Sequence, residues 1–153
     1  MHIHNLSIRK SIVSDVSQIM GLIHELALFE KSPEEVTNTA DRMIKDGFGS
    51  NPLFKCIVAE RDTEIIGFAL YYYRYSTWKG KCLYLEDFYV KQTHRNNGIG
   101  KLLFEEIIQI SKAESCVRIN WQVLDWNQEA VKFYSKFAAG FDKTWWNGFI
   151  DLK

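Results

Sequence analysis

Three runs rich in β-branched and aromatic residues follow one another in the middle of the chain and constrain its fold most strongly. They cover residues 54–60, 65–75 and 81–90, and only short polar or glycine-containing turns separate them. Runs of this composition and length are typical of β-strands, and connections this short join antiparallel neighbours. The sequence therefore predicts an antiparallel sheet of consecutive hairpins.

Segments with helical periodicity lie on both sides of these strands. Apolar residues recur at three- and four-residue spacing over residues 15–29, after Ser14-Asp15, where a helix-capping residue is expected. A shorter helix is predicted from Pro33 to the stop at Gly47. The remaining expected elements are a strand before the first helix, a helix starting at Gly98-Ile99-Gly100, a strand over 117–123, a helix over 127–137 and a last strand over 145–152.

The resulting order, βααβββαβαβ, predicts an α+β fold with a mixed, mostly antiparallel sheet and helices on both faces. The chain has 153 residues, of which 46% are hydrophobic, so it can bury a full core and is neither disordered nor fibrous. Because no repeat or flexible linker divides it, we expect one domain over residues 1–153.

Charge and cysteine content exclude several classes of function. The 19 basic residues balance the 19 acidic ones, so no overall field attracts nucleic acid or an acidic membrane, and we expect neither as a partner. The three cysteines form no CxxC pair, and the four histidines, His2, His4, His24 and His94, lack metal-ligand spacing. We therefore expect a cytoplasmic protein that needs no metal, and the chain shows no membrane-spanning apolar run.

A glycine-rich turn between a strand and a helix is the strongest local motif. A Walker loop requires Gly at position 95 and Ser or Thr at 102, where the chain has Arg95 and Leu102. A dinucleotide fingerprint requires glycine at 103, which is Leu103. The remaining pattern, R-x-x-G-x-G, exposes backbone amides to an anion at a helix N-terminus. The alternative is a tight turn and helix cap without a ligand.

This arrangement of strand, R-x-x-G-x-G turn, helix and strand, followed by Asn127 and Phe133-Tyr134, resembles the GNAT superfamily of acetyl-coenzyme A dependent N-acetyltransferases. Further segments are similar to the diamine (spermidine/spermine) acetyltransferases, and closest to their second type, the thialysine N-acetyltransferases. These segments are Glu25-Leu26-Ala27-Leu28-Phe29-Glu30-Lys31, Asp46-Gly47-Phe48-Gly49, Tyr75-Ser76-Thr77-Trp78-Lys79-Gly80, Tyr84-Leu85-Glu86-Asp87 and Leu124-Asp125-Trp126-Asn127-Gln128.

The resemblance implies a binding site for acetyl-coenzyme A. The backbone of Phe88, Tyr89 and Val90 would bind the pantetheine arm like an added strand, and Asn127 would hydrogen-bond it. Asn127 can equally be the N-cap of the following helix. The pyrophosphate would rest on the amides of Asn97 to Lys101, with Arg95 flanking it. The residues of the turn expected to bind the coenzyme are Arg95, Asn96, Asn97, Gly98, Ile99, Gly100 and Lys101.

The chemistry requires a proton acceptor, because an alkylammonium has a pKa about three units above neutrality and only the neutral amine can attack a thioester. By resemblance Glu86 is that base, on a strand whose alternation places residues 84, 86 and 88 on one face. Tyr134 would donate a proton to the leaving thiolate. The alternatives are a surface-strand carboxylate for Glu86 and a core position for Tyr134.

The resemblance to the diamine enzymes further implies that Glu30, Glu86, Asp87 and Trp78 hold the amine by charge and by an aromatic face. Ser76 replaces an acidic residue of the polyamine enzymes, and residues 143–148 lack their glutamate pair, so a lysine-like amino acid or short diamine is as plausible an acceptor as a polyamine. The resemblance also implies a homodimer. Two other functions remain open: acetylation of protein lysines or N-termini, and a catalytically silent module that binds coenzyme A.

Overall fold

A computed structural model describes residues 5–152, which fall into two compact units that are described separately. The first unit runs to Gln122 and the second begins at Val123. The strands of the first unit are β1 (Leu6–Lys10), β2 (Lys55–Arg61), β3 (Glu64–Ser76), β4 (Gly80–Val90) and β5 (Arg118–Asn120). Its α-helices are α1 (Val16–Phe29), α2 (Ala40–Phe48) and α3 (Ile99–Ala113), and the second unit contains α4 (Gln128–Ser135).

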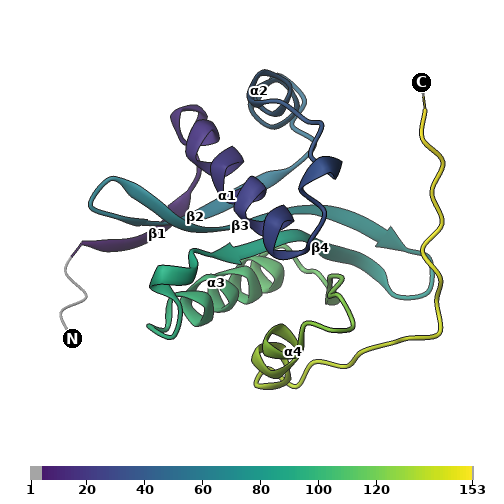
Figure 1. Cartoon of the computed structure of the whole chain (residues 1–153). Coiled ribbons are helices and arrows are strands. Elements are labelled where there is room, and N and C mark those ends of the chain that lie inside the picture. Colours follow the sequence, from purple (N-terminus) through teal and green to yellow (C-terminus); the bar gives the residue numbers. More distant parts are fainter. Residues whose placement is uncertain (1–4, 153) are drawn as a thin grey trace. The chain divides into compact units, whose positions relative to one another are not determined.

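The five strands form one sheet in the order β1-β2-β3-β4-β5 (Figure 1). The first four are antiparallel to their neighbours, and β5 pairs with β4 in parallel. The predicted central hairpins are confirmed, because their short turns leave consecutive strands no other partner. The mixed sheet of the expected α+β fold is confirmed with them.

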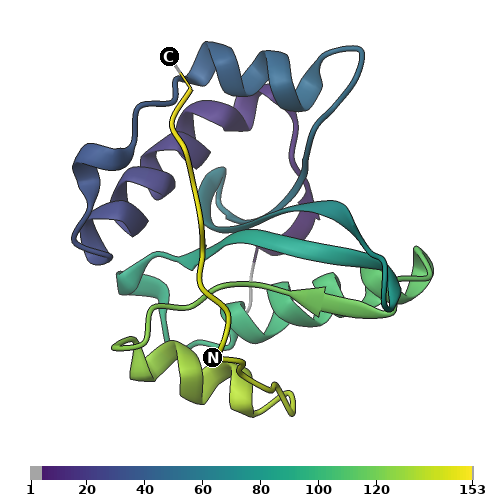
Figure 2. The ribbon, with the colours of Figure 1, turned by 90° about the vertical axis from the view of Figure 1, so that its right-hand side faces the viewer.

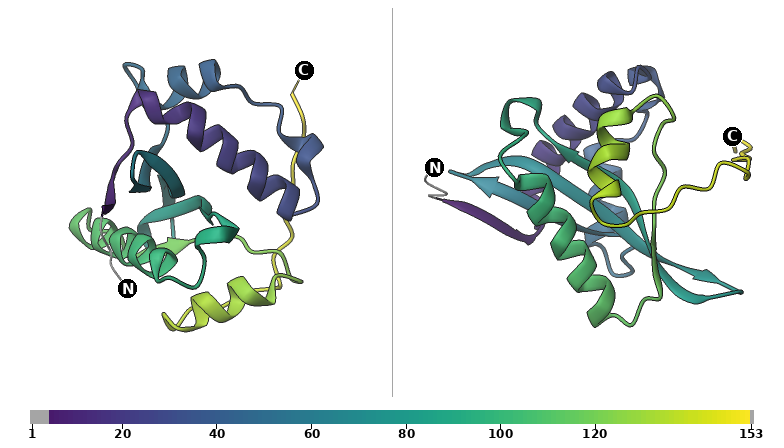
Figure 3. Two further views of the ribbon diagram at one scale, coloured as in Figure 1. Left: turned by 60° about the vertical axis from the view of Figure 1, so that its left-hand side comes forward. Right: turned by 90° about the horizontal axis from the view of Figure 1, so that it is seen from below.

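Helices cover both faces of this sheet, as the hydrophobic pattern predicts. Helices α1 and α2 lie on one face and α3 on the other (Figure 3, left). On the first face, Phe68 and Leu70 of β3 pack in one core cluster with Ile19 and Leu22 of α1. On the second, α3 approaches β3 so closely that a Cβ at Gly67 would lie 3.2 Å from Leu103 Cδ1. Glycine at this position lets α3 contact the sheet directly.

Arg9 ties β1 to the start of the first helical segment. Its guanidinium donates two hydrogen bonds to Asp15, of 2.7 and 3.0 Å, and one of 2.6 Å to Glu60. Asp15 also accepts the backbone N–H of Ile12 at 2.8 Å and makes no cap bond to α1. The expectation of a capping residue at Ser14-Asp15 is therefore wrong for Asp15, because the guanidinium takes its carboxylate and holds its pKa below the usual range.

The expected start of the second helix also differs from the structure. The second helix begins at Ala40 and not at Pro33, since Pro33–Glu35 forms one separate 3₁₀ turn. The side chain of Thr39 accepts the N–H of Arg42 at 3.2 Å and so fixes the helix start.

The last strand, expected over 145–152, is not formed. Residues 139–152 contain no helix or strand, and the large apolar side chains of this tail are exposed. Within the described part of the second unit the other regular element is α4, so the extended tail has no strand there with which to pair its backbone. The N-cap role of Asn127 is confirmed, because its Oδ1 accepts the N–H of Ala130 at 3.2 Å. Among the described residues, no helix is long and apolar enough to cross a membrane.

Candidate active site

β4 and β5 separate after a short stretch of pairing. Only Cys82, Leu83 and Tyr84 of β4 pair with β5 in the described chain, through Arg118, Ile119 and Asn120 (Figure 2). β4 continues to Val90 beside β3, so from Leu85 onward its other edge has no strand partner among these residues. Such an edge offers backbone N–H and C=O groups to an extended ligand. One of these groups is already used, since the Val90 carbonyl accepts Arg95 Nε at 3.0 Å.

A β-bulge at Glu86 rearranges the side chains of β4. Leu70 pairs with Asp87 and Tyr71 pairs with Leu85, so Glu86 is an extra residue in the ladder. Asp87 consequently lies on the same face as Leu70, which packs in the α1 core cluster. Phe88 turns to the opposite face, where its ring contacts Phe104 of α3 edge-to-face at 5.9 Å.

The alternation expected for residues 84, 86 and 88 is therefore wrong for Phe88. Tyr84 and Glu86 do share a face, as both contact Tyr72: the Tyr72 ring stacks on Tyr84 at 5.3 Å, and its hydroxyl donates to Glu86 Oε2 at 2.9 Å. The bulge adds Asp87 to this face in place of Phe88 because two consecutive residues oppose one residue of β3.

Among the acidic residues Glu30, Glu86 and Asp87, Asp87 has the position that disfavours a negative charge most. Burial raises its pKa from 3.8 to about 6, and the nearby carboxylates of Glu86 and Glu30 add to the rise. Desolvation also raises the pKa of Glu30, which follows α1 directly. The three acidic residues expected in the amine site thus influence one another across the face covered by α1, and a cation bound among them would relieve their repulsion.

Arg95 and Tyr89 connect the glycine turn to the end of α1. The Arg95 guanidinium lies over the rings of Phe29 and Tyr89, 5.2 and 5.3 Å from their centroids. The Tyr89 hydroxyl donates to Glu25 Oε2 at 3.3 Å. Arg95 therefore braces the turn against α1.

The glycine turn has the backbone geometry of an anion site. Asn96 and Gly98 have φ values of 61° and 78°, and Gly98 is the N-cap of α3 without a side-chain cap bond. Leu102 N–H bonds to the Gly98 carbonyl at 3.1 Å, and the amides of Ile99, Gly100 and Lys101 precede this first helical bond. Helix geometry gives those amides no carbonyl one turn back, so they can receive an anion.

Two expected site residues do not lie beside Glu86 and Asp87 in the first unit. Trp78 lies far along the β3–β4 hairpin, and Tyr134 belongs to the second unit. Trp78 is 85% exposed in the β3–β4 turn, and the strand from Gly80 to Glu86 spans about 20 Å. This hairpin projects beyond the helices (Figure 3, right). Tyr134 belongs to α4 in the second unit, where it is buried and contacts the Phe133 ring at 5.3 Å.

Sequence reasoning missed Tyr72 and Glu25. Tyr72 stands in the run Tyr71-Tyr72-Tyr73, and strand alternation alone could have placed it on the face opposite its two neighbours. Its partner Glu86 could not have been found in this way, because the bulge sets their register. The described residues contain no group of three or more potential metal ligands, and His2 and His4 lie outside them.

Comparison with known proteins identifies the family. The family model "Acetyltransferase (GNAT) family" matches residues 20–141. The chain belongs to this family. It is 38% identical over 154 residues to thialysine N-epsilon-acetyltransferase of Mus musculus, covering 95% of this chain and 90% of that protein. The chain is therefore an acetyltransferase, as the resemblance implied.

One further sequence relative and one solved structure are also similar to the chain. Spermidine/spermine N(1)-acetyltransferase-like protein 1 of Homo sapiens is 38% identical over 139 residues, which cover 86% of this chain and 20% of that protein. An aminoglycoside acetyltransferase from an uncultured soil metagenomic sample superimposes with a TM-score of 0.79 over 99% of both chains at 18% identity. The second likeness shows the GNAT fold alone.

The raised pKa of Asp87 predicts a pH-dependent stability difference. The pKa of Asp87 is 3.8 in the unfolded chain and about 6 in the folded chain, so folding disfavours its ionisation between these two pH values. Asp87→Asn removes this ionisation. The parent therefore loses unfolding free energy as the pH rises through this window, and the variant does not. We expect the variant to gain about 2 kcal/mol relative to the parent between about pH 4 and about pH 7, measured by urea denaturation.

Asp151→Asn is the matched control, because it makes the same change at an exposed position in the tail. Its stability is measured over the same pH range as the reference for losing one carboxylate. A stability gain of Asp87→Asn that does not exceed that of this control would show that Asp87 ionises as easily in the folded chain as in the unfolded one.

Proposed function

We propose that this GNAT enzyme transfers acetyl from acetyl-coenzyme A to a primary amine of a small molecule, by direct attack of the amine in a ternary complex. The acceptor class comprises diamines, polyamines and lysine-like amino acids. The observation that carries this proposal is the pairing of Glu86 and Asp87 on the α1 face of β4, on the stretch whose outer edge lacks a strand partner. A carboxylate pair there suits an ammonium group beside an extended thioester ligand.

The residues present fit acetyl-coenzyme A, which supplies an activated acetyl thioester when bound. The edge of β4 at Phe88 and Tyr89, which lies beyond the residues paired with β5, would receive the pantetheine amides. The amides from Asn97 to Lys101 would hold the pyrophosphate, because they lie at the positive end of α3 and lack intrahelical acceptors. Arg95 contributes by bracing this turn, and Asn127 remains a proposed contact besides its cap role.

Glu86 is the proposed proton acceptor for the ammonium. It is exposed and accepts the Tyr72 hydroxyl, whose pKa of about 12 keeps it protonated and donating at neutral pH. This hydrogen bond orients the carboxylate while leaving acceptor positions for the amine or a water molecule. Asp87 and Glu30 supply negative charge that favours an ammonium over a neutral ligand. Tyr134 is proposed to protonate the leaving thiolate.

A lysine-like amino acid or short diamine fits the acidic group better than a long polyamine. The relatives include a thialysine and a spermidine/spermine-type acetyltransferase, so both classes occur among similar chains. At the end of β3, Ser76 is uncharged, and the tail residues Lys143–Gly148 contain no carboxylate. The proposed site therefore concentrates its negative charge at one end, near Glu30, Glu86 and Asp87.

We expect this site to be completed by a second copy of the chain. Within one chain the strand separates Trp78 from Glu86, so Trp78 can contact the amine only by reaching the site of a partner. The tail also exposes Trp146, Phe149 and Ile150 by 97%, 86% and 87%, an apolar surface that association would cover. Sedimentation velocity is expected to show a homodimer, and a chain that stays monomeric at all concentrations would refute this composite site.

A panel of amines tests the proposed reaction. We expect release of free coenzyme A thiol with thialysine, lysine, ornithine, short diamines and spermidine, with kcat/KM higher for the less charged acceptors than for spermidine. The readout is a thiol-reactive dye, with mass spectrometry of the acetylated product. A matched panel of lysine-containing peptides and purified proteins is the comparison.

The outcomes separate the three candidate functions. Turnover confined to free amines supports the proposal. Acetylated peptides without acetylated small amines would establish protein acetylation in its place. Binding of coenzyme A by calorimetry, without turnover of any amine or peptide, would identify a silent binding module.

The two catalytic roles predict different changes in the pH–rate profile. Glu86→Gln is expected to lower kcat about 100-fold and to remove the acidic limb, because no carboxylate then accepts the proton. Tyr134→Phe is expected to lower kcat about 100-fold with an unchanged KM for acetyl-coenzyme A. Both are measured by thiol release from acidic to alkaline pH.

Glu106→Gln and Tyr75→Phe make the same changes at exposed positions on α3 and in the hairpin, and their profiles are expected to match the parent. A parental profile for Glu86→Gln would exclude Glu86 as the base. An unchanged kcat for Tyr134→Phe would likewise exclude the phenol as the acid.

A further inference from the structure

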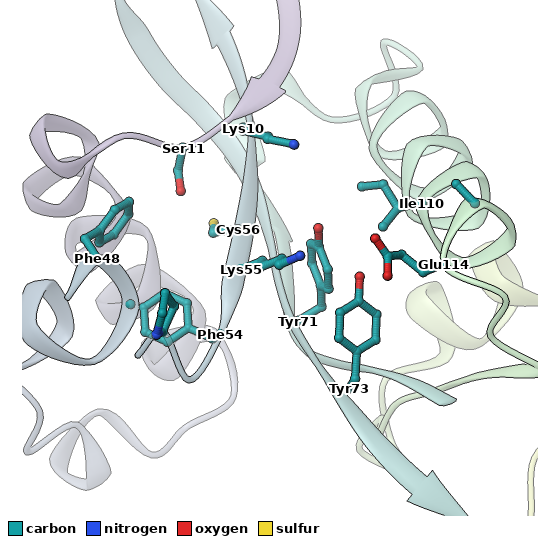
Figure 4. Close-up of a pocket in the computed structure, with 13 residues that line it drawn as sticks. Lys10, Ser11, Phe48, Phe54, Lys55, Cys56, Tyr71, Tyr73, Ile110 and Glu114 are labelled. Atoms are coloured by element: carbon teal, nitrogen blue, oxygen red, sulfur yellow. The ribbon is translucent and has the colours of Figure 1, made fainter. Parts of the chain in front are cut away.

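Arg74 lies on the face of the sheet that carries the proposed amine site. Tyr71 and Tyr73 of β3 project to the other face, where they line an open cavity of about 410 Å³ beside the C-terminal end of α3 (Figure 4). Side chains alternate along a strand, so Tyr72 and Arg74 both project to the α1 face. This is the face of Glu86, which accepts the Tyr72 hydroxyl.

A row of side-chain contacts joins Arg74 to Glu86. The Arg74 guanidinium lies over the Tyr84 ring, 5.6 Å from its centroid. The Tyr84 ring stacks on that of Tyr72 with their centroids 5.3 Å apart, and the Tyr72 hydroxyl donates to Glu86 Oε2 at 2.9 Å. The row therefore has a cation at one end, two aromatic rings in the middle and a carboxylate at the other end.

The Arg74 guanidinium has donors to offer a ligand. Within the described chain it makes no ion pair, although Glu86 and Asp87 lie on the same face. An arginine that rests on an aromatic ring is restrained, while the N–H groups at the edge of its planar guanidinium can bind a carboxylate by two parallel hydrogen bonds. Arg74 thus suits a ligand with a negative group.

The two kinds of charge are separated along the strands. Arg74 pairs with Cys82 in the β3–β4 ladder, and Cys82 lies about 13 Å along β4 from Glu86. Ser76, two residues beyond Arg74 on β3, carries no charge. The face therefore has a positive end at Arg74 and a negative end at Glu86 and Asp87.

A lysine-like amino acid matches this separation. Its extended chain places the terminal nitrogen about 7 Å from the carboxylate, and a hydrogen bond of about 3 Å at each end gives a reach of about 13 Å. Its methylene or thioether chain would pack on the rings of Tyr72 and Tyr84. A diamine of the same length would instead place its second ammonium beside Arg74, where like charges repel.

We propose that Arg74 determines acceptor specificity by binding the carboxylate of a lysine-like amino acid whose side-chain amine lies at Glu86. This inference rests on the proposed acetyl transfer to a small amine, and it narrows the acceptor class to amino acids with a terminal amine. The end of the site at Arg74 is exposed, so the α-amino group of the acceptor keeps its contact with water.

L-lysine and L-lysinamide, which differ in the carboxylate alone, test this role on the full chain. Arg74→Gln is expected to raise KM for lysine at least about tenfold with kcat unchanged, because a charge-assisted contact to the bound acceptor is lost. Lysinamide is expected to react with the variant at least as well as with the parent. The readout is thiol release.

Two further variants separate this contact from a general effect of charge. Lys79→Gln removes a positive charge from the exposed turn of the same hairpin and is the matched control. Its ratio of kcat/KM for lysine over lysinamide is expected to equal that of the parent. Arg74→Lys keeps the charge without the planar guanidinium and is expected to recover part of the loss. A parental ratio for Arg74→Gln, or an equal fall for Lys79→Gln, would overturn the inference.

Calorimetry in the presence of coenzyme A, which carries no acetyl group, gives a readout without turnover. Lysine is expected to bind the parent at least about tenfold more tightly than it binds Arg74→Gln. Equal affinities would overturn the role of Arg74 and leave the proposed acetyl transfer intact. A parent that releases no thiol with either compound would overturn the proposed function, and this inference with it.

Discussion

The extra residue that Glu86 inserts into the β3–β4 ladder decides which side chains meet on the α1 face of the sheet. Without it, Phe88 would follow Tyr84 and Glu86 on that face, and Asp87 would face α3. The bulge instead places Asp87 opposite Leu70 and sends Phe88 to Phe104. One extra residue in the hydrogen-bonded ladder therefore places two adjacent carboxylates on one face, and the pKa of one of them, Asp87, is raised.

The strand carrying this bulge also separates from β5, and the proposed acetyl transfer would use both features. A cation would relieve the repulsion between the carboxylates, and the edge of β4 beyond its pairing with β5 would hydrogen-bond an extended ligand. A thioester ligand along the edge and an ammonium against the carboxylates would satisfy both. The strand would then position the thioester and the amine relative to one another. The turn before α3 would hold the far end of the thioester ligand by its backbone amides.

The two sides of the sheet show how strand length creates sites. β5 is short and leaves the outer edge of β4 open, while β1 ends early and leaves the start of β2 open. Each opening exposes polar groups that the sheet itself does not satisfy. The first leads to the proposed acetyl-transfer site, and the second leads to an open cavity of about 410 Å³ beside Lys10 and Lys55.

The sequence by itself determined the order of the elements as far as α4, the central hairpins and the glycine turn before α3, because these follow from local periodicity and from turns too short to allow other neighbours. It also pointed to Glu86 and Asp87 as a pair. Only the tertiary structure decided the bulge, the Tyr72–Glu86 hydrogen bond and the hydrogen bonds from Arg9 to Asp15. Each of them joins residues of different elements, and no local sequence pattern sets which of these residues meet. The tail shows the same limit: residues 145–152 have the composition of a strand, but a strand forms only where another backbone offers it hydrogen bonds.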